Sequence, residues 1–223
     1  MSWLTPSRTT EEFSGRRARM VEVQLRQRGI RDERVLAAIG KVPRERFVAP
    51  EFQAEAYADA PLPIGSGQTI SQPFMVATML EALELRSSDR VLEVGAGTGY
   101  QAALLGEMAA EVWTIERHAG LAGRAQQILE ELGCRNVYVV HGDGSLGLPQ
   151  HAPFDKILVA AGSPQAPPSL VAQLAAGGIL AVPVGSRAEQ QLHIIRKTEG
   201  GIVTSGNVPC CFVPLVGAEG WEP

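Results

Sequence analysis

Three closely spaced glycines follow a short apolar stretch near the middle of the chain. Residues 91–94 predict a buried strand, and Gly95, Gly97 and Gly99 come directly after it. Glycines in such a turn let the backbone approach a ligand, because no Cβ stands in the way. Residues 100–110 are rich in Ala, Leu, Glu and Met and predict a helix, whose first N–H groups would face that ligand.

Two acidic residues stand where the next two predicted strands end. Glu116 closes the strand 111–116, where a carboxylate can accept hydrogen bonds from both ribose hydroxyls of a nucleoside. Asp143 follows the strand 137–140 and can accept from the exocyclic amine of adenine. The spacing Gly-x-Gly-x-Gly differs from the Gly-x-Gly-x-x-Gly of dinucleotide sites. It therefore favours S-adenosylmethionine, which has no pyrophosphate to bind.

A polar loop at 64–75 holds a different candidate. Gly65 and Gly67 lie beside hydroxyl and amide side chains, and Ser71 stands just before Pro73. By its local sequence alone Ser71 is expected to cap a helix over 73–85, because serine favours the N-cap and proline the first turn. A serine-hydrolase site is excluded, since no Gly-x-Ser-x-Gly surrounds Ser71 and no histidine partner stands out.

The elements that must position these residues alternate as in an α/β protein. Two final strands without an intervening helix predict an antiparallel tail on a parallel sheet. Helices at 11–28 and 32–39 predict an N-terminal cap, followed by an irregular stretch at 46–63. The remaining expected elements are strands at 154–160, 179–184, 191–198 and 201–216 and a helix at 168–176.

Length and charge limit the possible functions. The 223 residues suit one α/β domain, and a net charge of −4 argues against nucleic-acid binding. Residues 16–46 are nonetheless basic; they form either solvated helix faces or an approach surface for an acidic substrate group.

Residues 157–186 carry no charge, yet prolines and glutamines interrupt them, so they predict buried strands and no membrane span. Residues 1–8 lack a signal-peptide core, so we expect a cytoplasmic protein.

The cysteines and histidines do not suggest a metal or disulfide site. The three cysteines form no Cys-x-x-Cys pair, and the four histidines lack the spacing of metal ligands. Cys210 and Cys211 are adjacent on a predicted strand, so they should point to opposite faces and serve packing rather than redox chemistry.

Five segments together resemble the protein-L-isoaspartate O-methyltransferase family. The resemblance covers nearly everything from residue 20 to 216, and the Thr69-Ile70-Ser71 loop is far more specific than the glycine turn. The matching segments are 20–30, 42–47, 63–73, 91–100 and 212–215.

This resemblance implies a Rossmann-like class I S-adenosylmethionine-dependent methyltransferase. The fold would be a mostly parallel seven-stranded sheet with helices on both faces, in a single domain with a cap at 1–63 and a core at 64–217. The partner would be an isoaspartyl-containing protein or peptide, with no nucleic acid and no membrane, and we expect a monomer. Ser71 would be the active-site serine, with no metal. The expected cofactor contacts are Thr69, Ile70, Glu93, Gly95, Ala96, Gly97, Gly99, Glu116, Arg117, Asp143 and Gly144.

One departure from the family pattern bears on the substrate. Cys211 stands where the family usually has an arginine, just before residues 212–215. Either the selectivity for isoaspartyl groups is weaker, or another cation, such as an N-terminal arginine, takes the place of the missing arginine. Two further hypotheses stay open: a methyltransferase for another carboxylate or small molecule, and a non-catalytic cofactor-binding module.

Overall fold

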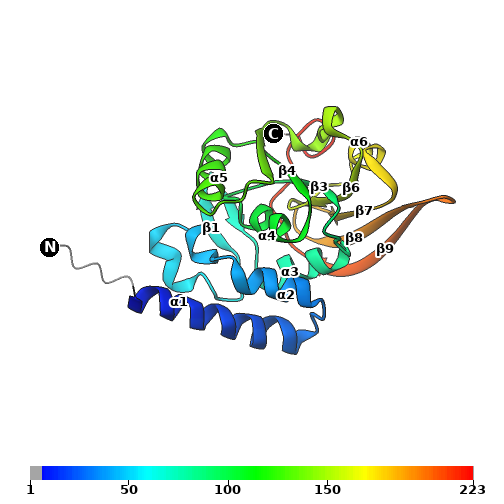
Figure 1. Ribbon diagram of the computed structural model, residues 1–223. Helices are drawn as coiled ribbons and strands as arrows, with labels where there is room; N and C mark the ends of the chain where they lie inside the picture. Colours follow the sequence, from blue (N-terminus) through cyan, green and yellow to red (C-terminus); the bar gives the residue numbers. More distant parts are fainter. Residues whose placement is uncertain (1–6, 223) are drawn as a thin grey trace.

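The computed structural model describes residues 7–222 and is built on a seven-stranded sheet (Figure 1). The strand order is β5-β4-β3-β6-β7-β8-β9. Strands β3 to β7 pair parallel with one another, whereas β8 pairs antiparallel with both β7 and β9, which confirms the predicted parallel sheet with an antiparallel tail. The strands are β3 (Arg90–Val94), β4 (Glu111–Glu116), β5 (Val137–His141), β6 (Phe154–Val159), β7 (Leu174–Gly185), β8 (Gln190–Thr198) and β9 (Gly201–Cys210).

Helices cover both faces of this sheet. Alternate residues of β7 belong to two separate buried clusters, Ile179 to one and Leu180 to the other, because side chains of a strand alternate between its faces. The first cluster also contains residues of α3, α4 and α5, and the second contains Leu170 of α6. The helices are α3 (Pro73–Ala82), α4 (Tyr100–Met108), α5 (Ala119–Glu131) and α6 (Pro168–Ala172).

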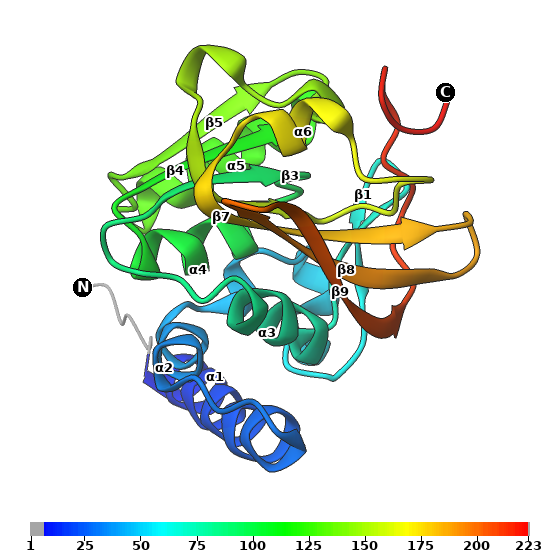
Figure 2. The same ribbon diagram turned by 90° about the vertical axis from the view of Figure 1, so that its right-hand side faces the viewer.

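The N-terminal helices lie together at one end of the molecule, as Figures 1 and 2 show. The single helix expected at 11–28 is composite: α1 (Ser7–Arg19) continues as a π-helical turn over Met20–Leu25 and a 3-10 turn over Arg26–Arg28. Gly29 ends this stretch with φ +109°, as predicted. Helix α2 (Glu33–Lys41) begins at the expected cap Asp32, whose carboxylate accepts from two backbone N–H groups. The cap shares the first buried cluster with the sheet.

The polar loop is a small antiparallel hairpin, with strands β1 (Leu62–Gly65) and β2 (Gln68–Ile70). Ser71 follows β2 but does not cap the next helix. The N-cap residue of α3 is Gln72, which has no capping side-chain bond, and Asp59 accepts from the N–H of Phe74 at 3.4 Å. The expectation that Ser71 is a helix cap is therefore wrong.

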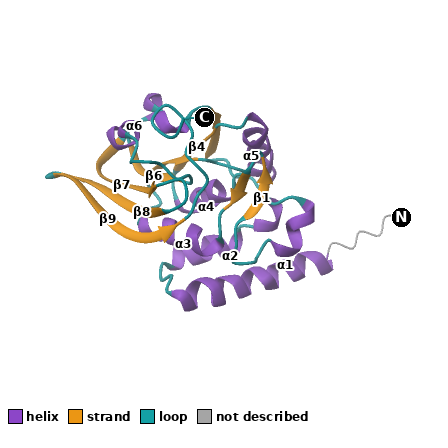
Figure 3. Ribbon diagram, turned by 180° about the vertical axis from the view of Figure 1, so that it is seen from behind, coloured by secondary structure: helices purple, strands orange, loops and turns teal. Residues whose placement is uncertain are grey.

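The last third of the chain departs most from the expected boundaries. The helix expected at 168–176 ends at Ala172, and β7 begins at Leu174 instead of 179, with an irregular register near Gly177 and Gly178. The strand expected at 201–216 ends at Cys210. Residues 211–222 leave the sheet and cross back over the ends of the parallel strands; we call this segment the C-terminal strap (Figure 3).

The expectation of a cytoplasmic protein was based on residues 1–8. Residues 1–6 of this segment lie outside the described part of the chain. Within residues 7–222, no helix is both long and apolar enough to cross a membrane.

Candidate active site

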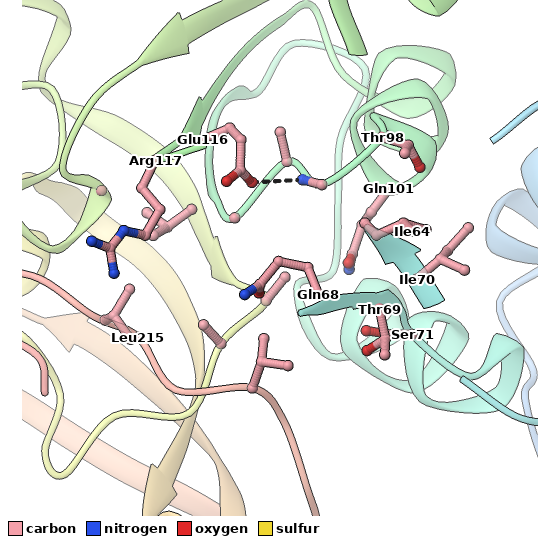
Figure 4. Close-up of a pocket in the computed structure, with 18 of the residues that line it drawn as sticks. Ile64, Gln68, Thr69, Ile70, Ser71, Thr98, Gln101, Glu116, Arg117 and Leu215 are labelled. Carbon is pink, nitrogen blue, oxygen red and sulfur yellow. Dashed lines mark hydrogen bonds between the residues drawn. The ribbon is translucent and has the colours of Figure 1, made fainter. Parts of the chain in front are cut away.

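A pocket opens at the carboxyl ends of β3 and β4, and we call it the inner pocket (Figure 4). Its empty volume, including the space at its mouth, is about 780 Å³, which is within the usual size range of small-ligand sites. Its walls come from the β1–β2 hairpin, the glycine turn, the end of β4 and the C-terminal strap. The polar and glycine residues of these walls are Gln68, Thr69, Ser71, Gly95, Gly97, Thr98, Gln101, Glu116, Arg117 and Gly144.

The glycine turn has the conformation that the sequence predicts. Gly95, Gly97 and Gly99 have φ values of +94°, +56° and +92°, which favour glycine over any residue with a side chain. A Cβ on Gly97 would also come within 2.9 Å of Ile64 in the hairpin. Gly99 packs on Leu129 of α5 and does not line the pocket, so its role is to let helix α4 begin close to its neighbour.

Glu116 closes one side of the inner pocket. Its carboxylate accepts from the N–H of Gly97 at 2.9 Å, shown dashed in Figure 4, and from the N–H of His118 at 2.8 Å. These bonds fix both oxygens at the wall, where each still has a free lone pair for a ligand hydroxyl. Arg117 lies beside it on the same wall.

Glu93 is not at the wall. It is fully buried in β3, where its carboxylate accepts from the hydroxyl of Thr114 on β4. Burial, assisted by the charge of Glu116, raises the pKa of Glu93 to about 8. The geometry therefore gives Glu93 a place beneath the glycine turn and does not support a direct cofactor contact.

Asp143 lies next to the pocket but faces the C-terminal strap. One carboxylate oxygen accepts from the N–H and hydroxyl of Ser145, and the other accepts from the N–H of Ala218 at 2.8 Å. Burial alone would raise the pKa of Asp143, but these bonds outweigh it and lower the pKa. Asp143 and Gly144 were both expected to contact the cofactor, but only Gly144 lines the pocket.

Ser71 and Thr69 separate the inner pocket from a second depression, the outer groove. Both residues line both cavities, and Figure 4 shows their side chains close together below Gln101. Cys210 is half-buried in the groove, where burial raises its thiol pKa to about 11, and Cys211 is exposed. The groove is lined by Pro61, Thr69, Ser71, Gln72, Met75, Ala160, Pro209, Cys210, Cys211, Phe212 and Val213.

Gln101, which the sequence analysis did not single out, is also part of the inner pocket. It is only 7% exposed, and its amide nitrogen has no hydrogen-bond partner among the described residues. In Figure 4 its side chain reaches from α4 toward the hairpin. The only sequence signal for a role in the pocket was its position directly after Tyr100, in the first turn of the helix. A glutamine at that position is equally compatible with an exposed side chain.

The comparisons with known proteins identify the family. A sequence model of the protein-L-isoaspartate(D-aspartate) O-methyltransferase family matches residues 16–220. The chain belongs to this family. A protein-L-isoaspartate O-methyltransferase of Koribacter versatilis is 57% identical over 211 residues, covering 95% of each chain. The relative of that name from Methanoculleus marisnigri is 53% identical, covering 92% of this chain and 94% of its own.

Solved structures of protein-L-isoaspartate O-methyltransferases share the fold. One superposes with a TM-score of 0.81 at 30% identity, over 92% of this chain and 67% of its own. A second structure, from Plasmodium falciparum, is assigned to the same enzyme class. It superposes with a TM-score of 0.77 at 27% identity and covers 88% of this chain and 96% of its own. That structure was determined with S-adenosyl-L-homocysteine bound. The cofactor of the family is S-adenosylmethionine.

The residues of this chain fit such a cofactor. A fixed carboxylate at a strand end suits a ribose diol, and the unpartnered amide of Gln101 suits a polar group brought by a ligand. Within residues 7–222 no cluster of three or more His, Cys, Asp or Glu side chains could hold a metal ion.

Proposed function

We propose that this chain transfers a methyl group from S-adenosylmethionine to the α-carboxylate of L-isoaspartyl residues in damaged proteins or peptides. The observation that supports this is the arrangement of the two cavities, which share Thr69, Ser71, Ala160 and Val213 as lining residues. A cofactor in the inner pocket and a peptide in the outer groove would meet at this shared wall, where Thr69 and Ser71 supply the hydroxyl groups. A backbone amide nitrogen would then attack the methyl ester and expel methanol, which gives a succinimide whose hydrolysis returns part of the product to normal aspartyl.

The reaction needs no general base at this site. A carboxylate with an ordinary pKa near 4 is already ionised at neutral pH, so it is ready to attack. S-adenosylmethionine, when bound, supplies an electrophilic methyl group on a positively charged sulfur. The opposite charges partly neutralise in the transition state, so water, which stabilises both reactants, slows the reaction. No charged side chain lines the outer groove, so a peptide bound there would displace water and hold the carboxylate in one orientation.

Individual residues then have distinct roles. Glu116 accepts from the ribose, and Gly144 with Arg117 lies at the adenine end of the inner pocket. Gly95, Ala96 and Gly97 pass close to the methionine moiety. Thr69 and Ile70 of the hairpin also contact the cofactor. Ser71 donates a hydrogen bond to the substrate carboxylate and forms no covalent bond with it.

The chain is also proposed to act as a single domain, as a monomer and in the cytoplasm. The buried cluster that runs from Met20 to Phe212 supports the single domain, since it joins the N-terminal cap to the sheet. Three free thiols, Cys134, Cys210 and Cys211, suit a reducing compartment.

Methyl transfer to matched peptides tests this function. We expect transfer to an isoaspartyl peptide and none to the peptide with normal aspartate at that position. Ser71→Ala should lower kcat by roughly tenfold to a hundredfold, the usual effect of losing a hydrogen bond to a charged group, with little change in cofactor affinity. Ser88→Ala, an exposed serine after α3, is the control. Equal transfer to both peptides would refute the isoaspartyl assignment, and unchanged turnover of Ser71→Ala would remove Ser71 from the mechanism.

A further inference from the structure

Arg44 is a fully buried arginine that contacts the main chain of Ser71. Its Nε donates to the carbonyl of Ala56 at 2.8 Å, and Nη2 donates to the carbonyl of Ser71 at 2.9 Å. The guanidinium carbon lies 4.9 Å from the ring centre of Tyr100, at the start of α4. The remaining Nη1 is buried without a partner among residues 7–222. This side chain therefore links the cap, the serine loop and the glycine turn.

The positive charge of Arg44 has no carboxylate of its own in the described part of the chain. Two acidic residues are close, but each already faces another arginine. Glu45 lies 3.9 Å from Arg17, and Asp59 forms an ion pair with Arg28. An arginine stays protonated even when buried, and an unbalanced buried charge is costly. An anion bound nearby would recover part of that cost.

The outer groove lacks a cation where its substrate needs one. None of its lining residues is charged, and Cys211 occupies the position where the family resemblance leads one to expect an arginine. Arg117 is on the wall of the inner pocket and does not line the groove. Arg44 is the cation bonded directly to a residue of the groove wall, Ser71, from behind.

We propose that Arg44 is the positioning residue that makes the Ser71 end of the groove selective for a carboxylate. The proposal rests on the isoaspartyl function above. Arg44 does not touch the substrate; it fixes the Ser71 carbonyl and places a positive charge behind it. Because the charge is fully buried, water and salt screen it weakly. It thereby supplies the attraction for the α-carboxylate that Cys211 does not.

The test compares an isoaspartyl peptide with its isoasparaginyl analogue, in which the α-carboxylate is an uncharged amide. For wild type, we expect the acid to bind at least tenfold more tightly, measured as KM for the acid and as Ki for the amide. Arg44→Met should raise KM for the acid about tenfold and leave Ki for the amide unchanged. Arg44→Lys should restore most of the preference, because it keeps the charge.

Two controls separate this effect from a loss of structure. Arg46→Met removes an exposed arginine, paired with Glu131, from the same turn and should change neither constant. S-adenosylhomocysteine affinity, measured by calorimetry, should stay within twofold in all variants. Equal weakening of acid and amide would make Arg44 purely structural. Equal binding of the acid and amide peptides by wild type would also overturn the proposal. This comparison remains decisive even if Arg44→Met does not fold. Methyl transfer by wild type establishes the isoaspartyl function separately.

Discussion

At the scale of single residues, two side chains define opposite ends of the inner pocket. Glu116 is held by two backbone N–H groups, whereas the amide nitrogen of Gln101 is buried without a partner in residues 7–222. If Glu116 accepts from the ribose, the amino-acid end of the cofactor extends toward the hairpin, where Gln101 points. A buried amide without a partner costs free energy that a bound ligand can return.

Gln101→Leu tests this orientation, because leucine keeps the bulk and removes the hydrogen bonds. We expect the affinity for S-adenosylhomocysteine to fall about tenfold. The affinity for methylthioadenosine, which lacks the amino-acid end, should not change. Calorimetry with both ligands measures the difference, and Gln126→Leu on the exposed side of α5 is the control. A similar loss for both ligands would place Gln101 elsewhere in the pocket or in a structural role.

At the scale of elements, the adjacent strands β3 and β4 share a buried acid. Glu93 of β3 accepts from Thr114 of β4, and burial raises the pKa of Glu93 to about 8. In the unfolded chain its pKa is near 4.3. As pH rises through this interval the unfolded chain loses the proton while the folded chain keeps it, so stability falls until about pH 8 and then levels off.

Glu93→Gln should remove this pH dependence and keep an acceptor for Thr114. We expect no gain in the free energy of unfolding near pH 4 and a growing gain up to pH 8, on the order of a few kcal/mol. Urea unfolding at several pH values measures it, with exposed Glu51→Gln as the control. A variant that is no more stable than wild type at pH 8 would show that the pKa of Glu93 is not raised in the folded protein.

Local sequence was sufficient to predict the elements that end at the inner pocket. Short apolar runs followed by glycine or by a terminal acid identified β3, β4 and β5, and their parallel pairing brings Gly95 and Glu116 together. The boundaries near 174 and 210 could not be predicted in this way. Residues 174–185 contain no polar side chain, so no change of period marks where α6 stops and β7 begins.

The roles of Asp143 and Ser71 show what local sequence leaves out. Asp143 accepts from Ala218, 75 positions later in the chain, and the strap that brings Ala218 there has no regular pattern. Ser71 has the local signature of a helix cap, yet the N–H of Phe74 bonds to Asp59. In both cases a contact between distant segments decides the role. Arg44 lies in the matching segment 42–47, but its local sequence does not indicate that its side chain is buried or that it bonds to Ser71.

At the scale of the whole molecule, the cap, the hairpin and the strap meet over the carboxyl ends of the parallel strands. The hairpin and the strap supply walls of both cavities, and Arg44 ties the cap to Ser71. The strap is anchored at both sides of the inner pocket, since Leu215 donates to Gly162 at 2.8 Å and Ala218 to Asp143. The chemistry thus depends on segments from the beginning, middle and end of the chain.

A crystal structure with S-adenosylhomocysteine and an isoaspartyl peptide tests this account most directly. We expect the ribose hydroxyls within hydrogen-bonding distance of the Glu116 carboxylate. The sulfur should face the outer groove beside Ser71, with the peptide α-carboxylate in line with it. A cofactor bound elsewhere, or a peptide whose carboxylate lies away from Ser71, would contradict the proposed transfer between the two cavities.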